Sequence, residues 1–121
     1  MRTCAALLLL LAACGSSEPV PQTAQQCAEA YFRAQMAWDV DGMMRHTVER
    51  SREKDRAQIE SELLSKRELI DHFVITITGE RVSGNRSIIS FHQVTYFKDG
   101  RKNEFNAERQ LVFEEGRWWI L

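Results

Sequence analysis

The sequence predicts an α+β domain in which helices come first and an antiparallel sheet follows. From residue 27 to residue 38, apolar side chains recur at intervals of three and four, which is the period of a helix. After Asp71 the period changes to two, as in a strand. Turn sequences at residues 83–86, 98–101 and 114–117 separate the alternating stretches, which is typical of hairpins.

Residues 1–13 have the composition of a signal peptide. Arg2 supplies the positive charge, and the apolar run over residues 5–11 is too short to cross a bilayer. The segment that follows, Leu11-Ala12-Ala13-Cys14, resembles the bacterial lipobox. That resemblance implies that Cys14 is acylated and becomes the first residue of the mature protein.

Residues 14–22 then form the lipidated cysteine and a short tether, because the segment is small, polar and interrupted by Pro19 and Pro21. Gly15 stands where an aspartate would resemble an inner-membrane retention signal. We therefore expect an exported protein anchored at the periplasmic face of a bacterial membrane, the outer one if the cell has two. Residues 23–121 suit one small domain.

Composition excludes several classes of function. Removing Arg2 from the 16 basic side chains leaves 15 against 17 acidic ones, a net charge of −2 that gives no reason to expect nucleic-acid binding. Of three cysteines, Cys4 lies in the signal and Cys14 would carry lipid, so Cys27 stands alone and forms no internal disulfide. A free cysteine on a helix is most often buried.

The first helix is expected to begin at Thr23, whose hydroxyl caps it while Gln26 completes a capping box. Its apolar stripe comprises Cys27, Ala30, Tyr31, Ala34, Ala37 and Trp38. Residues 39–42 end the helix, with Gly42 in the left-handed conformation and Asp41 as the cap of a short second helix.

A third helix is expected to begin within the charged run at residues 49–56, which we interpret as a solvated face. Ser51 is its expected cap, and Ile59, Leu63 and Ile70 line one side. A second capping-box match at Ser65 and Glu68 leaves open where this helix breaks.

The strands follow from alternation. Phe73, Ile75 and Ile77 share one face of the first strand. The second, residues 87–98, carries apolar side chains on both faces, which indicates a central strand covered on two sides or a bulge near His92. The third strand turns Phe105, Ala107, Arg109, Leu111 and Phe113 to one side. Trp118 and Trp119 point to opposite faces of the last strand.

Helices followed by hairpin-linked strands, with the turn YFKDGRKNEF and the ending LVFEEGRWWIL, resemble the nuclear transport factor 2-like superfamily over residues 23–121. Membership implies a cone-shaped domain, also described as cystatin-like, whose curved antiparallel sheet wraps the first helix. The resemblance also implies a pocket on the concave side and, in many members, a homodimer formed through the sheet.

Enzymatic relatives resembling ketosteroid isomerase place a tyrosine on the first helix and carboxylic acids in the pocket. Tyr31 matches the first feature, but the acids on the strands alternate outward. The three histidines show no zinc spacing, and no phosphate loop or nucleophile elbow is present, so the sequence predicts no metal and no cofactor. An isomerase-like or hydrolase-like enzyme therefore remains the alternative function.

Arg109 interrupts the apolar row of its strand. Either its long stem lets the charge reach solvent at a sheet edge or bulge, or its guanidinium binds an anionic ligand such as a carboxylate at the pocket mouth. The candidate ligand-binding residues are Tyr31, Trp38, His92, Arg109 and Trp118. We expect a non-enzymatic, membrane-anchored protein that binds a small molecule or an envelope protein. An open pocket favours the small molecule, and a filled one with an exposed patch at Trp118 or Trp119 favours a protein partner.

Overall fold

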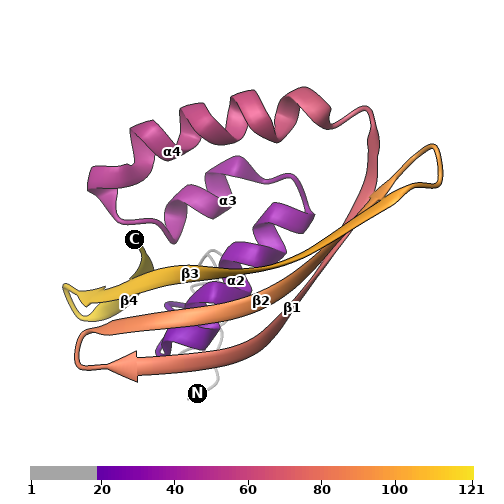
Figure 1. Ribbon diagram of the computed structural model, residues 1–121. Coiled ribbons are helices and arrows are strands. Elements are labelled where there is room, and N and C mark those ends of the chain that lie inside the picture. Colours follow the sequence, from indigo (N-terminus) through magenta and orange to yellow (C-terminus); the bar gives the residue numbers. More distant parts are fainter. Residues whose placement is uncertain (1–18) are drawn as a thin grey trace, which may run out of the picture.

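A computed structural model describes residues 19–121 of the chain. The signal, the lipobox and Cys14 lie outside the described residues. The elements, in chain order, are α2 (Ala24–Met36), α3 (Val40–Arg45), α4 (Glu49–Glu62), the 3₁₀ turn η1 (Leu64–Lys66), β1 (Ile70–Ser83), β2 (Arg86–Phe97), β3 (Lys102–Glu114) and β4 (Arg117–Ile120). Helices thus precede a curled antiparallel sheet, which confirms the predicted fold class (Figure 1).

Helix α2 begins as predicted. The Thr23 hydroxyl accepts a hydrogen bond from the Gln26 backbone amide at 3.0 Å, and the Gln26 side-chain oxygen accepts one from the Thr23 backbone amide at 3.2 Å. Its buried stripe includes Cys27 and Tyr31 and also Phe32, which the sequence pattern had not singled out. Burial raises the pKa of the Cys27 thiol to about 11, so this free cysteine is an unreactive core residue.

The end of α2 differs from the prediction. The helix stops at Met36, Ala37 is exposed, and Trp38 rather than Gly42 adopts the left-handed conformation, with φ of 60°. The Trp38 amide donates to the Gln35 carbonyl at 3.0 Å and the Asp39 amide to the Ala34 carbonyl at 2.8 Å. This hydrogen-bond pattern is a Schellman motif, normally built with glycine.

Helix α3 is capped by Asp39 rather than by Asp41. The Asp39 carboxylate accepts from the Gly42 amide at 2.9 Å, which places Gly42 inside the helix. At that position a Cβ atom would lie 2.4 Å from Asp39 Oδ2 and 3.0 Å from the Ala34 Cβ. Gly42 is therefore required by close packing, and its backbone does not use the left-handed region.

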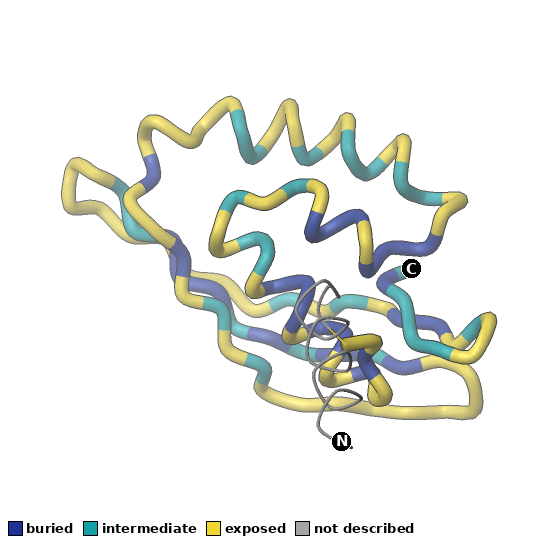
Figure 2. The backbone as a smooth tube through the Cα atoms, turned by 180° about the vertical axis from the view of Figure 1, so that it is seen from behind, coloured by how far each residue is buried: buried dark blue, intermediate teal, exposed yellow. Residues whose placement is uncertain are grey.

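Helix α4 starts directly after Val48, so Ser51 lies inside it and caps nothing. The helix gives way to η1 at Leu64, and Ile70 belongs to β1, where it is 5% exposed. No residue of α4 is buried, as its exposed outer turns in Figure 2 show. Within residues 19–121, no helix is long and apolar enough to span a membrane.

The four strands form a meander in the order β1-β2-β3-β4. Gly84, Gly100 and Gly116, at φ of 59°, 92° and 79°, allow the three predicted hairpin turns. Strand β2 is a central strand, between β1 and β3, and its register with β3 runs unbroken past His92. The register with β1 shifts between Ile77 and Gly79, opposite Phe91 and Ser90, so the irregularity lies in β1 beside His92. The backbone at His46 and Val48 bonds to Ile120 and covers the β4 edge.

The core lies between α2 and the concave face of the sheet, which α2 crosses (Figure 1). Its buried residues are Ala24, Cys27, Ala28, Tyr31, Phe32, Met43, Met44, Ile89, Phe91, Leu111 and Ile120. Alanine and cysteine side chains let α2 approach the strands closely, because they occupy little space between backbone and sheet.

The packing at Gly42 yields a stability prediction. Gly42→Ala is expected to lower the free energy of unfolding by about 1–3 kcal/mol, since the new methyl group must displace the Asp39 side chain that caps α3. Urea unfolding measures the change. Gly79→Ala is the matched control, because its Cβ would meet only the Ser90 Cβ at 3.9 Å and should cost little. Equal losses in both variants would contradict the packing argument.

Candidate functional site

A cavity of about 380 Å³ lies among α2, α4 and the concave face of the sheet. Its apolar wall includes Ile59, Leu63, Ile70, Phe73, Phe97 and Phe105. The charged side chains that line it are Asp55, Glu62, Lys66 and Arg109. Uncharged polar side chains line it as well, namely Gln35, Gln58, Gln93, Thr95 and Asn103, so polar and apolar groups share the lining. A concave space in which polar groups converge beside an apolar wall is the usual place for a small molecule to bind.

Tyr31 and Arg109 meet in this cavity, from α2 and β3 respectively. The Arg109 guanidinium carbon lies 5.0 Å from the centre of the Tyr31 ring, in a cation–π contact. Tyr31 is 2% exposed, and burial raises its pKa. The positive charge of Arg109 opposes this rise, and the negative charge of Asp55 adds to it.

The structure shows on which face of the sheet Arg109 lies. Arg109 pairs with Ile89 in an unbroken register, so no bulge turns it outward, and its half-buried side chain lines the cavity. None of the ion pairs found within residues 19–121 includes Arg109. Arg109 is thus a half-buried guanidinium that lines the cavity beside Tyr31 and has no carboxylate bonded to it among the described residues.

Helix α4 contributes acids that the sequence interpretation missed. Asp55 belongs to the run taken as a solvated face, and this holds for the exposed Glu53 and Lys54 but not for the half-buried Asp55. The missed signal is spacing, because Asp55 lies four residues before Ile59 and Glu62 three after it, on the same side of the helix. The ion pairs among the described residues do not include Asp55 either.

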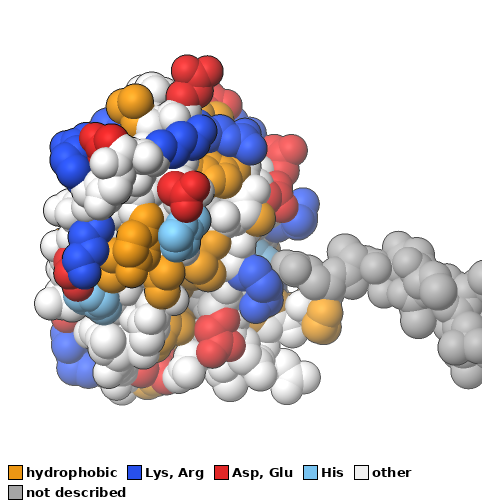
Figure 3. Space-filling model, turned by 90° about the vertical axis from the view of Figure 1, so that its right-hand side faces the viewer, with side chains coloured by type: hydrophobic (Ala, Val, Ile, Leu, Met, Phe, Trp, Pro, Cys, Tyr) orange, Lys and Arg blue, Asp and Glu red, His pale blue; other side chains and the backbone are white. Residues whose placement is uncertain are grey.

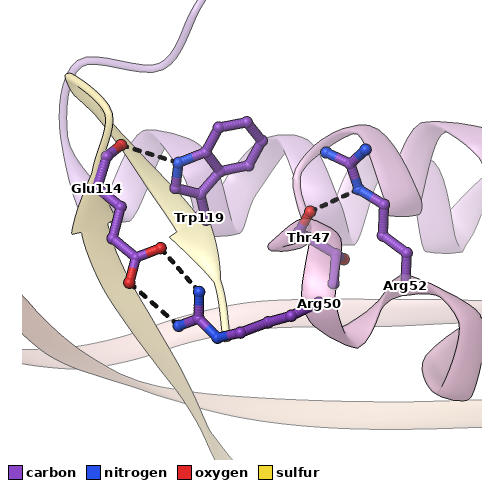
Figure 4. A network of polar contacts seen from close by, with 5 residues as sticks. All are labelled: Thr47, Arg50, Arg52, Glu114 and Trp119. Carbon is purple, nitrogen blue, oxygen red and sulfur yellow. Dashed lines mark hydrogen bonds and ion pairs between the residues drawn. The ribbon is translucent and has the colours of Figure 1, made fainter.

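Polar contacts hold the first half of α4 over the sheet (Figure 4). Arg50 donates twice to the Glu114 carboxylate, at 2.9 and 3.1 Å, and lowers the pKa of Glu114 through these bonds. Arg52 donates to the Thr47 carbonyl at 2.8 Å. The cavity lies beneath the second half of the helix, where Ile59 and Leu63 face inward without being fully buried.

Two of the other predicted site residues lie near the concave face but outside the cavity. Trp38 packs 5.1 Å from the Phe73 ring and beneath the Arg67 guanidinium at 5.3 Å, so it supports a cavity residue without lining the space itself. Trp118 packs on Phe113 and the core cluster. Neither side chain reaches Arg109.

His92 lies on the outer face of the sheet, opposite the cavity, because its neighbour Phe91 occupies the inner position. Its ring nitrogens bond to Asn106 at 2.9 Å and Glu104 at 3.1 Å, and both bonds raise the pKa of His92. His92 therefore does not share the cavity with Tyr31 and Arg109, which corrects its place among the predicted ligand-binding residues. Figure 3 shows a face on which hydrophobic and histidine side chains lie together among charged ones. Residues 19–121 contain no group of three potential metal ligands.

No protein-family model and no curated protein sequence matches the chain. Solved structures, in contrast, do match the chain. A protein described as a candidate calcium/calmodulin-dependent protein kinase type II association domain, from Thiobacillus denitrificans, is 16% identical with a TM-score of 0.72, over 85% of this chain and 93% of that one. An NTF2-like protein of unknown function from Burkholderia pseudomallei is 13% identical with a TM-score of 0.56, over 78% and 83%.

A candidate hydroxylase from Streptomyces galilaeus is 12% identical with a TM-score of 0.61, over 80% of this chain and 73% of that one. At such identities the likeness shows the fold alone. The domain accordingly has the NTF2-like α+β fold, as the sequence resemblance implied. Proteins with different described roles share this fold, so function has to be argued from the site.

The charges around Tyr31 predict a measurable titration. Arg109→Gln is expected to raise the Tyr31 pKa further, because it removes the nearby positive charge, and Asp55→Asn to lower it. NMR of ring-labelled tyrosine follows the titration. Tyr96, the only other tyrosine in the sequence, serves as internal control. An unchanged Tyr31 titration in both variants would show that neither charge acts on the hydroxyl.

Proposed function

We propose that the domain binds a small organic anion in the cavity beneath α4, with Arg109 as the anchor for a carboxylate. The observation that carries the proposal is the half-buried Arg109 guanidinium, stacked on Tyr31 and free of a carboxylate partner within the described chain. A guanidinium offers paired donors that match a carboxylate, and partial burial strengthens the resulting bond.

The apolar wall defines the rest of the ligand. Phe97 and Phe105 lie near the β2–β3 turn, outside the core cluster, and line the cavity together with Phe73. Phe105 keeps 40% of its surface exposed. An apolar or aromatic body placed against these rings would remove that surface from water, which favours binding by about 25 cal/mol per Å².

The protein-partner version is less well supported. A protein partner was predicted for the case in which side chains fill the pocket and an exposed aromatic patch lies at Trp118 or Trp119. The cavity is open, and Trp119 is flanked by the Arg52 and Arg117 guanidiniums at 5.7 and 3.9 Å from its ring centre. Trp118 packs against the core cluster. Pairing of two copies through the outer face of the sheet is compatible with ligand binding and stays a prediction.

The enzymatic alternative gains one observation, since Asp55 supplies the pocket acid that the strands lack. An acid that acts in proton transfer has to lie within hydrogen-bond reach of its substrate. Asp55 and Glu62 come from a helix with no buried residue, where solvent reaches them. Binding without chemistry therefore remains the favoured function.

We further propose that residues 1–13 export the chain and that Cys14 anchors it, so that binding takes place at a membrane surface of the cell envelope. The lipobox resemblance at Leu11–Cys14 and the tether composition of residues 14–22 support this location. Domain 23–121 would then hold its cavity close to the membrane.

Binding can be tested with 3-phenylpropionate, which combines a carboxylate with an aromatic body. In the Arg109→Gln variant the dissociation constant should rise by at least about tenfold, because a charge-assisted hydrogen bond contributes roughly 1.5–3 kcal/mol. Calorimetry or NMR titration measures this constant. Arg81→Gln is the matched control, since Arg81 pairs with Glu108 away from the cavity. Equal affinity in wild type and Arg109→Gln would refute the proposal.

The anchor has its own test. Cys14→Ala should abolish acylation and move the protein from the membrane to the soluble fraction of fractionated cells, while circular dichroism of the domain stays the same. Cys27→Ala is a control for the loss of a thiol as such, because Cys27 lies in the core. Retention of the Cys14→Ala protein in the membrane fraction would remove the lipid anchor from the proposal.

A further inference from the structure

We infer that the ligand is a small zwitterion of the amino-acid type, with its carboxylate at Arg109, its ammonium group at the α4 acid Asp55, and an apolar or aromatic side chain against Phe97 and Phe105. The inference rests on the proposed function and extends it from an organic anion to a molecule of both charges.

The first argument is the charge of the cavity. Its lining contains two acids, Asp55 and Glu62, and two bases, Lys66 and Arg109, so the described lining carries no net charge. A ligand with a carboxylate alone would bring an unmatched negative charge beside the two acids. A zwitterion leaves the balance unchanged, and each of its charges has an opposite charge to meet.

The second argument is that the two half-buried charges do not neutralise each other. Arg109 and Asp55 both line the cavity, yet no ion pair joins them. Other arginines of the chain do find carboxylates, as Arg50 finds Glu114 and Arg56 finds Asp41. Two separated, opposite charges facing one space are the arrangement that a molecule with both groups would bridge.

The third argument is which element carries which charge. Arg109 stands on β3, where it is paired with Ile89 of β2, whereas Asp55 stands on α4, whose first half is held by polar contacts. A zwitterion would therefore connect α4, on one side of the cavity, to β3 on the other. The cavity of about 380 Å³ lies at the small end of the range of about 300–1,000 Å³ for ligand sites, which suits a single amino acid.

The test compares three probes that share a phenyl ring and differ in charge: L-phenylalanine, 3-phenylpropionate and phenethylamine. The dissociation constant of each is measured by NMR titration of the wild-type domain. We expect phenylalanine to bind at least about tenfold more tightly than either singly charged probe, since each lacks one charge-assisted contact. If 3-phenylpropionate binds as tightly as phenylalanine, the zwitterion inference is overturned while the proposed anion site stands.

The Asp55→Asn variant assigns the ammonium position. Phenylalanine should lose at least about tenfold in affinity, while 3-phenylpropionate binds as well or better, because a repelling charge is gone. The ratio of the two constants within one variant does not depend on how much of the sample is folded. Glu53→Gln, on the exposed side of the same helix, is the matched control.

Two further outcomes distinguish failure of the zwitterion inference from failure of the proposed anion site. If Asp55→Asn leaves the ratio unchanged, Asp55 is not the ammonium partner and the inference fails in this form. If neither phenylalanine nor 3-phenylpropionate binds, and Arg109→Gln changes nothing, the anion site itself fails and the inference falls with it.

Discussion

Helix α2 in the concave face of the sheet is the contact on which the rest of the structure depends. The helix touches all four strands, and its fully buried Cys27 and Ala28 allow that close approach. A curled sheet with one apolar face has to bury that face against another element. Because the core cluster formed around α2 omits Phe97 and Phe105, the sheet near the β2–β3 turn stays available to line a cavity.

The cavity remains open because the second layer above it is polar. Helix α4 has no buried residue, and its first half is attached through arginine contacts to Thr47, Asp41 and Glu114. A helix of this composition gains little by collapsing onto the sheet, since burying its charges would cost more than the apolar contact would return. Its position is set by hydrogen-bond geometry, so space is left beneath Ile59 and Leu63.

The character of the site follows from how charge is distributed between these layers. The sheet contributes the cation Arg109 next to the buried Tyr31, and helix α4 contributes Asp55 and Glu62. The solved structures that share the fold differ in their described roles and are at most distantly similar in sequence. The specificity proposed for this domain therefore rests on these few side chains rather than on the fold.

Local signals in the sequence determined the fold class, the capping box at Thr23 and the hairpin turn before Gly100, because each depends on hydrogen bonds or periodicity among neighbouring residues. Only the tertiary structure decided what long-range packing controls. The contact with Phe73 and Arg67 accompanies the left-handed Trp38, the unbroken strand pairing turns Arg109 inward, and the path of α4 brings Asp55 over the cavity. A run of charges does not reveal which of its members will face another element, since that depends on where the chain returns after folding.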